Sequence, residues 1–281
     1  MDSIISPRKV ADSLSVEKLR ELVRASPNHF TKNGRTFACH GFGYPKDSPV
    51  LFIKHGVHIF KPTDEEARNQ RWAREALQKL PPSEREGIHI PEIYRVVSTE
   101  TSTIIIMEFV PGKTLEYFLE NPEYTDRLDR YFGKIERALK LFLSFPVPED
   151  ASPGPCGGGV IRSPLFKDYE STIEYPTVEL LEMHLNKIAT WFSKDADRLV
   201  LERKLHFVFS DLYEGNFMFT ENEDLYVIDF EQANFLPLSF MTYAMIQHHD
   251  VCSLKDRFSL PENNLEIMRR VCQLDESLCK W

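Results

Sequence analysis

Three polar side chains, Asp211, Asn216 and Asp229, are spaced in a way that suits chemistry on phosphate groups. Asn216 follows Asp211 by five residues and Asp229 follows Asn216 by thirteen, in the stretches FSDLYEGNFMF and LYVIDFEQA. One carboxylate of such a set can orient an attacking hydroxyl and accept its proton. An amide and a second carboxylate can hold magnesium against the phosphates. The pattern therefore indicates a phosphoryl-transfer site, with Asp211 as the base and Asn216 and Asp229 as magnesium ligands.

Each acid taken alone also has an ordinary structural explanation. Asp211 could cap a turn, and Asp229 could end a strand. The joint pattern favours a site, because polar groups within apolar strands are costly to bury without a purpose. The five-residue step from Asp to Asn is also the step found in the catalytic loop of kinases.

The elements that must position these residues change in character along the chain. Up to about residue 110, β-like runs alternate with helices, including a helix over 16–25 that begins after Ser15. Beyond Pro111 helices dominate, interrupted by a loop rich in Pro and Gly and by a hairpin whose strands are NFMFT and LYVIDF. This order predicts an α+β protein with a β-rich N-terminal lobe, residues 1–110, and a larger, mostly helical C-terminal lobe, residues 111–281.

Composition narrows the class of protein. The net charge of −9 offers no field for holding nucleic acid or an anionic membrane, so neither is expected as a partner. No stretch approaches the roughly 20 apolar residues that span a bilayer, and the N-terminus has no signal-peptide core. Five scattered cysteines without CxxC spacing indicate reduced thiols. We therefore expect a cytoplasmic protein; its oligomeric state is left open.

The catalytic stretch resembles the signature of the aminoglycoside phosphotransferase and choline kinase superfamily. In that signature an Asp-Leu pair, an Asn and an Ile-Asp-aromatic-Glu run follow one another, as do Asp211-Leu212, Asn216 and Ile228–Glu231 here. The segments EARNQ, MEFVPGKT, SDLYEGNF and DFEQANFLPLSF look closest to a fungal branch, and the resemblance extends from about residue 50 to 245. One departure is Phe209, where many relatives carry a His that supports the loop.

The resemblance implies a bilobal protein-kinase-like fold that uses ATP and Mg²⁺ to phosphorylate a hydroxyl of a small molecule. Lys54, in the apolar run VLFIKHG, is implied to contact the α- and β-phosphates of ATP; a lysine stem can also snorkel from a strand edge. Its implied ion-pair partner is Glu66 of EARNQ, with Glu65 and Glu75 as alternatives.

Two further parts of a nucleotide site are less distinct. The run 107–110, MEFV, is expected to be the hinge, where backbone groups of Glu108 and Val110 would bind adenine; it could also simply end a buried strand. Asn33-Gly34 and the run 40–43, HGFG, are candidates for covering the phosphates, although both also suit ordinary hairpin turns.

Three acidic residues are candidates for the pocket that binds the acceptor. An acidic pocket would suit a cationic acceptor, with Glu170, Glu231 and Asp250 as candidates. The run 157–159, GGG, is typical of a flexible linker, whereas the resemblance implies a loop near the acceptor pocket. The pair His248-His249 is not expected to bind metal, because adjacent residues of a helix point apart.

Two alternatives to a small-molecule kinase each account for part of the sequence. A non-catalytic kinase-fold module that binds nucleotide or a protein would explain Phe209 and the indistinct glycine loop, but it has no need of all three metal-site residues. A protein kinase would need HRD, DFG and APE elements with an activation loop between them. Only thirteen residues separate Asn216 from Asp229, and no APE follows.

Overall fold

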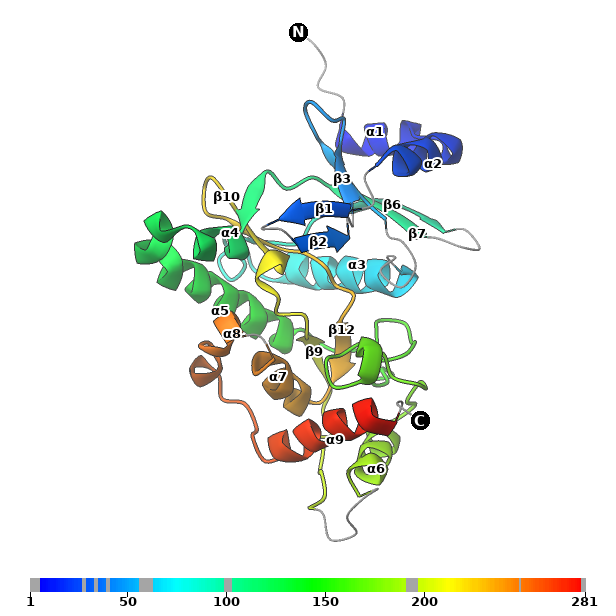
Figure 1. The fold of residues 1–281 in the computed structure, drawn as a ribbon, viewed down its shortest axis with the longest axis vertical. Helices are drawn as coiled ribbons and strands as arrows, with labels where there is room; N and C mark the ends of the chain where they lie inside the picture. The colour runs from blue at the N-terminus through cyan, green and yellow to red at the C-terminus, as the bar shows by residue number, and fades with distance from the viewer. Residues whose placement is uncertain are drawn as a thin grey trace.

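The N-terminal part of the computed structural model combines a four-stranded sheet with helices on both of its faces (Figure 1). The structure describes residues 6–26, 29–32, 35–38, 41–55, 63–98, 103–190, 197–247 and 249–278. The elements of this part are α1 (Pro7–Ser13), α2 (Val16–Ala25), β1 (His29–Lys32), β2 (Arg35–Ala38), β3 (Gly41–Tyr44), β4 (Leu51–Lys54), α3 (Asp64–Lys79), β5 (Ile88–His89), β6 (Ile93–Ser98) and β7 (Thr103–Glu108).

The sheet has the order β3-β4-β7-β6, and each neighbouring pair is antiparallel. Side chains of a strand alternate between the two faces. Leu51 and Ile53 of β4 accordingly pack with α1 and α2 on one face. Phe52 lies on the opposite face with Ala67 of α3. Lys54 has the parity of Phe52, so the strand itself directs this lysine toward α3.

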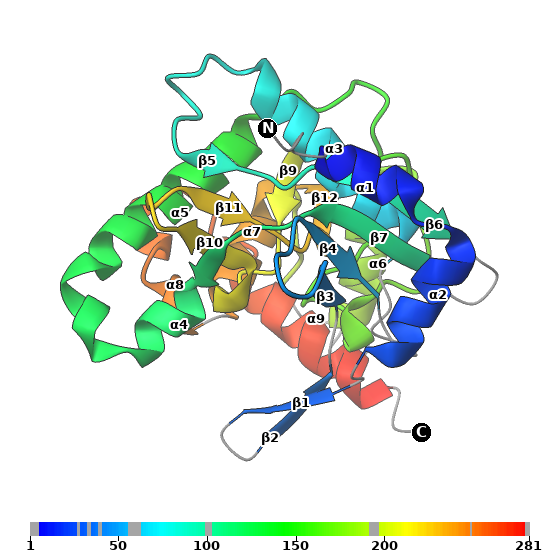
Figure 2. The same cartoon turned by 90° about the horizontal axis from the view of Figure 1, so that it is seen from above.

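Helices and two small sheets make up the C-terminal part (Figure 2). Its sheets have the orders β5-β11-β10-β8 and β12-β9, so β5 and β8 join strands that lie more than a hundred residues later. The elements are β8 (Gly112–Thr114), α4 (Leu115–Glu120), η2 (Pro122–Arg127), α5 (Leu128–Ser144), η3 (Lys167–Tyr169), α6 (Val178–Ala189), β9 (His206–Phe209), η4 (Glu214–Asn216), β10 (Phe217–Thr220), β11 (Leu225–Val227), β12 (Ala233–Leu236), α7 (Leu238–Met245), α8 (His249–Cys252), η5 (Lys255–Arg257) and α9 (Leu265–Leu278).

The predicted hairpin and helix starts are present. β10 and β11 pair antiparallel with Phe217 opposite Val227, and the turn closes through a bond from the Glu223 amide to the Thr220 carbonyl. The side chain of Ser15 accepts from the Lys18 amide at the start of α2. The α+β class expected from the sequence is confirmed.

Helix α3 lies between the four-stranded sheet and the C-terminal elements (Figure 1). It contacts β6 of that sheet and also α5 and β12. On the face of α3 that contacts the C-terminal part of the chain, the ring centroid of Trp72 lies 4.9 Å from those of both Phe207 of β9 and Phe235 of β12. One helix is therefore packed against both parts of the chain and holds its own side chains in place relative to each of them.

Candidate active site

Lys54 ends β4 and is nearly buried, with 8% of its surface exposed. Its Nζ atom lies 2.6 Å from Oε1 of Glu66 and 2.9 Å from Oδ1 of Asp229. Burial alone would lower the pKa of the ammonium, but the two carboxylates outweigh burial and raise it. The lysine is therefore firmly charged, and it joins a helix of the N-terminal part to the segment that carries Asp229.

Glu66 owes its place to the start of α3. The Thr63 side chain caps this helix by accepting from the Glu66 amide at 3.1 Å, and Glu66 stands in the first turn, which favours acids. It is fully buried, and burial raises the pKa of its carboxyl to about 7 despite the opposing charge of Lys54. Of the alternatives, Glu75 is exposed and Glu65 is half-buried, and neither has an ion pair to Lys54 among the described contacts.

Asp211 and Asn216 lie on the loop between β9 and β10. The Nδ2 atom of Asn216 donates to the carbonyl of Asp211 at 3.2 Å, and the carbonyl of Asn216 accepts from the Ile228 amide at 3.0 Å. This second bond joins the loop to the segment that follows β11. Burial, and then the charge of Asp229, raise the pKa of Asp211 to about 6. A carboxyl whose pKa is so strongly perturbed is typical of a functional site.

Asp229 lies two residues beyond the end of β11 rather than on a strand, as the sequence had suggested. Its φ of +62° is left-handed, a conformation that non-glycine residues adopt rarely. The bend turns its carboxylate back toward Lys54. Apart from that ion-pair contact, the buried Oδ1 atom has no hydrogen-bond partner among the described residues.

The donor set suits magnesium. Lys54 pairs with the carboxylates of Glu66 and Asp229, and its charge also acts on Asp211, so the ionised cluster has more negative than positive charge. Mg²⁺ prefers carboxylate and amide oxygens and usually completes its shell with substrate phosphates. Among the described residues no group of three or more His, Cys, Asp or Glu side chains could hold a metal by itself. An amide and a carboxylate that share the ion with phosphates are compatible with that finding.

A cavity of about 380 Å³ adjoins these charges. Lys54, Glu66 and Asp229 line its polar end. The remainder is largely apolar and comes from the strand ends around the expected hinge: Phe52, Pro91, Met107, Glu108, Phe109, Val110, Pro111, Gly112, Met218 and Ile228. A mostly apolar slot with charges at one end matches the shape of a site for a base attached to phosphates.

Both expected hinge residues line this cavity, but their backbone groups differ. The Glu108 amide donates to the carbonyl of Glu92 at 2.8 Å and is not available to a base. The Glu108 carboxylate is also engaged, since it accepts from the Glu92 amide at 3.1 Å. The carbonyl of Glu108 and the amide of Val110 remain the candidate adenine contacts.

The candidates for a phosphate-covering loop find little support. Asn33, Gly34 and His40 lie outside the described residues. Gly41 and Gly43 belong to β3, a strand rather than a loop. A Cβ at Gly41 would come within 2.7 Å of the Ile53 carbonyl, so close strand pairing accounts for this glycine.

The glycine-rich segment is docked rather than free, against the linker prediction. The Cys156 amide donates to Oδ1 of Asn69 at 2.8 Å, and Arg68 donates to the carbonyls of Cys156 and Gly158, both at 2.8 Å. Gly157 and Gly158 have φ near +80°, which explains their residue type. The sequence reasoning missed Arg68 and Asn69. The signal was present in EARNQ, where the polar residues Asn69 and Gln70 are both buried on the helix.

The acids proposed for the acceptor pocket separate into two groups. Glu231 and Glu170 share the guanidinium of Arg162, the latter at 3.1 Å. Asp250 lies elsewhere, beside Glu214 of the catalytic loop, and its proximity is one of the causes that raise the pKa of Glu214 after burial. Of the histidine pair, His248 lies outside the described residues and His249 begins α8.

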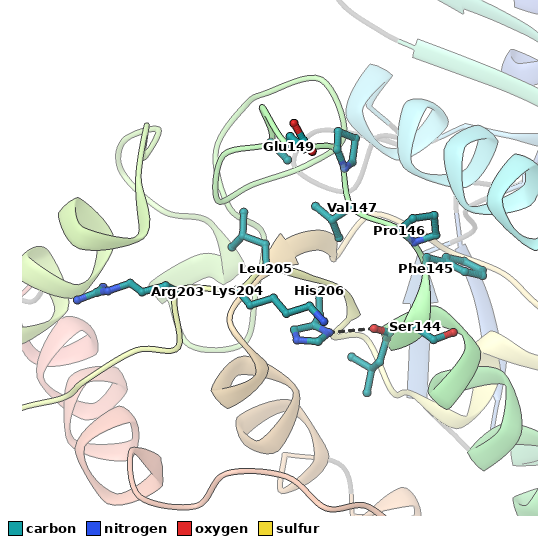
Figure 3. A pocket seen from close by; sticks show the side chains of 12 residues that line it. Ser144, Phe145, Pro146, Val147, Glu149, Arg203, Lys204, Leu205 and His206 are labelled. Atoms are coloured by element: carbon teal, nitrogen blue, oxygen red, sulfur yellow. Dashed lines mark hydrogen bonds between the residues drawn. The ribbon is translucent and has the colours of Figure 1, made fainter.

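A second cavity, of about 440 Å³, lies at the opposite end of β9 from the catalytic loop (Figure 3). The end of α5, the segment that follows it and residues 203–206 line it. At its base, Nδ1 of His206 lies 2.9 Å from the Leu143 carbonyl. The cavity contains none of the residues predicted to do chemistry, so it is separate from the site around Lys54.

Comparison with solved structures finds aminoglycoside phosphotransferases at low identity. A thermostable mutant of APH(4)-Ia, in ternary complex with ADP and hygromycin B, aligns with a TM-score of 0.49 and 13% identity over 90% of this chain and 82% of that one. Spectinomycin phosphotransferase APH(9)-Ia, in complex with ADP and spectinomycin, aligns with a TM-score of 0.46 and 15% identity over 94% and 86%. No curated protein sequence matches significantly.

The family assignment comes from a sequence model. The model described as the phosphotransferase enzyme family matches residues 57–240, which is more than half of the 281 residues. The matched stretch includes Glu66, Asp211, Asn216 and Asp229, and Lys54 lies just before it. The chain therefore belongs to the phosphotransferase enzyme family.

Proposed function

We propose that the protein is an ATP- and Mg²⁺-dependent phosphotransferase that acts on a hydroxyl of a small molecule. The observation that carries the proposal is the Lys54–Glu66–Asp229 ion-pair cluster at the polar end of a mostly apolar cavity. Adenine would occupy the apolar part near Glu108 and Val110, and the phosphates would extend toward Lys54. In this assignment residues 1–110 supply Lys54, Glu66 and the hinge of the nucleotide site, and residues 111–281 supply the rest of its lining, the catalytic loop, the metal ligands and the acceptor pocket.

Each polar residue has a role that follows from its charge and place. Lys54 would neutralise phosphate oxygens, and Glu66 would hold the lysine in position. Asn216 and Asp229 would be the protein ligands of magnesium, which when bound neutralises charge on the phosphates. Asp211 would orient the acceptor hydroxyl and take its proton; the raised pKa of its carboxyl makes it a better base than an ordinary aspartate.

For the acceptor we propose a hydroxylated amine. Support comes from the acidic side chains around the catalytic loop. After burial, Glu116 and Glu120 contribute to raising the pKa of Tyr213, and Asp250 contributes to raising the pKa of Glu214. A cationic acceptor would be attracted to this side of the loop. Glu170 and Glu231 are weaker candidates, because Arg162 already compensates their charge.

We further propose a cytoplasmic location. Cys156, Cys252 and Cys272 are free thiols in the described structure, as expected in a reducing compartment. No helix within the described ranges is long and apolar enough to cross a membrane. Cys39 and Cys279 lie outside the described residues.

The test of the function is a magnesium- and ATP-dependent phosphorylation screen over hydroxylated amines and a cell extract, with ADP release as the signal. The wild-type protein should transfer phosphate to at least one acceptor, and Asp211→Asn should transfer none while still binding Mg·ATP. A wild-type protein that binds Mg·ATP but never consumes it would favour the alternative, a non-catalytic nucleotide-binding module.

A further inference from the structure

The metal-binding end of the site is connected to α3 by one buried amide side chain. Asn69 has no exposed surface and lies three residues after Glu66 on the same helix. Its Nδ2 atom donates to the carbonyls of Phe230 at 3.0 Å and Ala233 at 2.7 Å. Its Oδ1 atom accepts from the Cys156 amide at 2.8 Å. Three segments distant in the sequence therefore meet at a single side chain.

Phe230 directly follows Asp229, so the bond to its carbonyl acts on the backbone that aims the Asp229 carboxylate. A left-handed aspartate is strained and persists only where the surroundings hold it. Asn69 supplies two donors on the C-terminal side of this bend. The Lys54 contact holds the side chain of Asp229 itself.

Glu66 and Asn69 lie almost one turn apart, so α3 carries the partner of Lys54 and the support of Asp229 on one rigid element. The glycine-rich segment completes the arrangement from the other side. Its Cys156 amide satisfies the oxygen of Asn69, and Arg68 of the same helix binds the carbonyls of Cys156 and Gly158. Docking of this segment therefore orients the asparagine whose nitrogen holds the bend after Asp229.

We propose that Asn69 is a positioning residue for the metal site: with the docked glycine-rich segment, it sets the position of Asp229 relative to Lys54. The inference rests on the proposed function, because it assumes that Asp229 binds magnesium with the nucleotide. Residues outside the ligand shell that orient a ligand commonly change metal affinity by about 10- to 100-fold.

Gln70 provides a matched control. It follows Asn69 on α3 and is also buried, but its amide nitrogen donates to the Pro91 carbonyl at 2.9 Å and contacts Sδ of Met107 at 3.8 Å. None of its described bonds reaches the segment after Asp229. Replacing Gln70 tests the general cost of removing a buried amide from this helix.

The experiment measures by calorimetry the dissociation constant of AMP-PNP with and without Mg²⁺, for wild type, Asn69→Ala and Gln70→Ala. The dissociation constant without Mg²⁺ divided by the constant with Mg²⁺ isolates the metal contribution from any change in the adenine pocket. Asn69→Ala should reduce this ratio about tenfold, and Gln70→Ala should leave it at the wild-type value. If Asn69→Ala does not fold, as judged by circular dichroism, Asn69→Ser replaces it and should reduce the ratio in the same direction.

The outcomes separate the two claims. A wild-type protein without any effect of magnesium on nucleotide binding would overturn the proposed function and this inference with it. A normal wild-type ratio that Asn69→Ala and Asn69→Ser leave unchanged would overturn the positioning role alone. Equal losses in the Asn69 and Gln70 variants would also overturn it, since they would show a general effect of damage to α3.

Discussion

At the scale of single residues, the site consists of ionisable groups that are buried away from water. Asp211 is buried beside Asp229, and Glu66 is buried on a helix, so both carboxyls have raised pKa values. Lys54 forms an ion pair with Glu66, and its charge also acts on Asp211. Such groups reduce stability, and chemistry with a charged ligand explains why they are present.

The first residue-scale prediction concerns Asp211. Its pKa rises from 3.8 in the unfolded chain to about 6 in the fold, so folding favours the protonated form. The resulting loss of stability is absent below pH 3.8, develops as the pH rises to 6 and is complete above it. Asp211→Asn should therefore be more stable than wild type at pH 7.5, by up to about 3 kcal/mol.

The measurement is urea unfolding of both proteins in magnesium-free buffer at pH 5 and pH 7.5. The difference in the free energy of unfolding should be larger at pH 7.5 than at pH 5. A variant less stable than wild type at pH 7.5, or a difference that does not depend on pH, would show that Asp211 is not held in a costly environment.

A second residue-scale prediction concerns Phe209, where many members of the resembled superfamily carry His. The ring is buried against Phe230, with centroids 5.2 Å apart, and against Phe142 and Phe217 at slightly more than 6 Å. Apolar packing here supports the catalytic loop without a hydrogen bond. Phe209→His would place an unsatisfied polar ring in this cluster and should lower the free energy of unfolding by about 1–3 kcal/mol. Equal or greater stability in urea unfolding would contradict this explanation.

At the scale of elements, α3 organises the site. The apolar run that carries Lys54 is a local signal of the sequence, and the resemblance pointed to Glu66 as the ion-pair partner of this lysine. They did not predict that Asn69 would bond Phe230 or that residues 154–159 would dock on the helix. Those contacts join residues 161 and about 88 positions apart and depend on packing of the whole chain.

The same limit explains the backbone of Asp229. Its position after an apolar strand was visible in the sequence, but its left-handed φ was not. Nothing local requires that conformation, and Asp is only moderately tolerant of it. The ion pair to Lys54, the Ile228–Asn216 bond and the bonds from Asn69 enforce it together.

The element-scale prediction compares two acids of α3. Glu66→Gln removes the buried partner of Lys54, and the misplaced ammonium should reduce kcat/KM for ATP about 100-fold. Glu75→Gln, an exposed acid of the same helix, should change it less than twofold. Steady-state kinetics with the acceptor found in the screen gives both values. Similar values of kcat/KM for the two variants would contradict the assignment of Glu66 as the residue that positions Lys54.

At the scale of the whole molecule, the two parts of the chain meet around one cavity. The four-stranded sheet brings Lys54 and the expected hinge, and the strands β10 and β11 bring Met218 and Ile228 to the opposite wall. The boundary between lobes at residue 110 stays a prediction, and β5 pairs across it with β11. A ligand in this cavity would touch both parts and should stabilise them together.

The central claim is that this cavity binds a magnesium nucleotide through Lys54 and Asp229. Thermal unfolding with AMP-PNP tests it without any need for the acceptor. At 100 times the dissociation constant of the nucleotide, Mg·AMP-PNP should stabilise wild type by about 2.7 kcal/mol. Asp229→Ala should lose most of this gain, and Asp224→Ala, a change in the hairpin turn outside the cavity lining, should retain it. A wild-type protein that Mg·AMP-PNP does not stabilise, or an Asp229→Ala variant that it stabilises fully, would contradict the account.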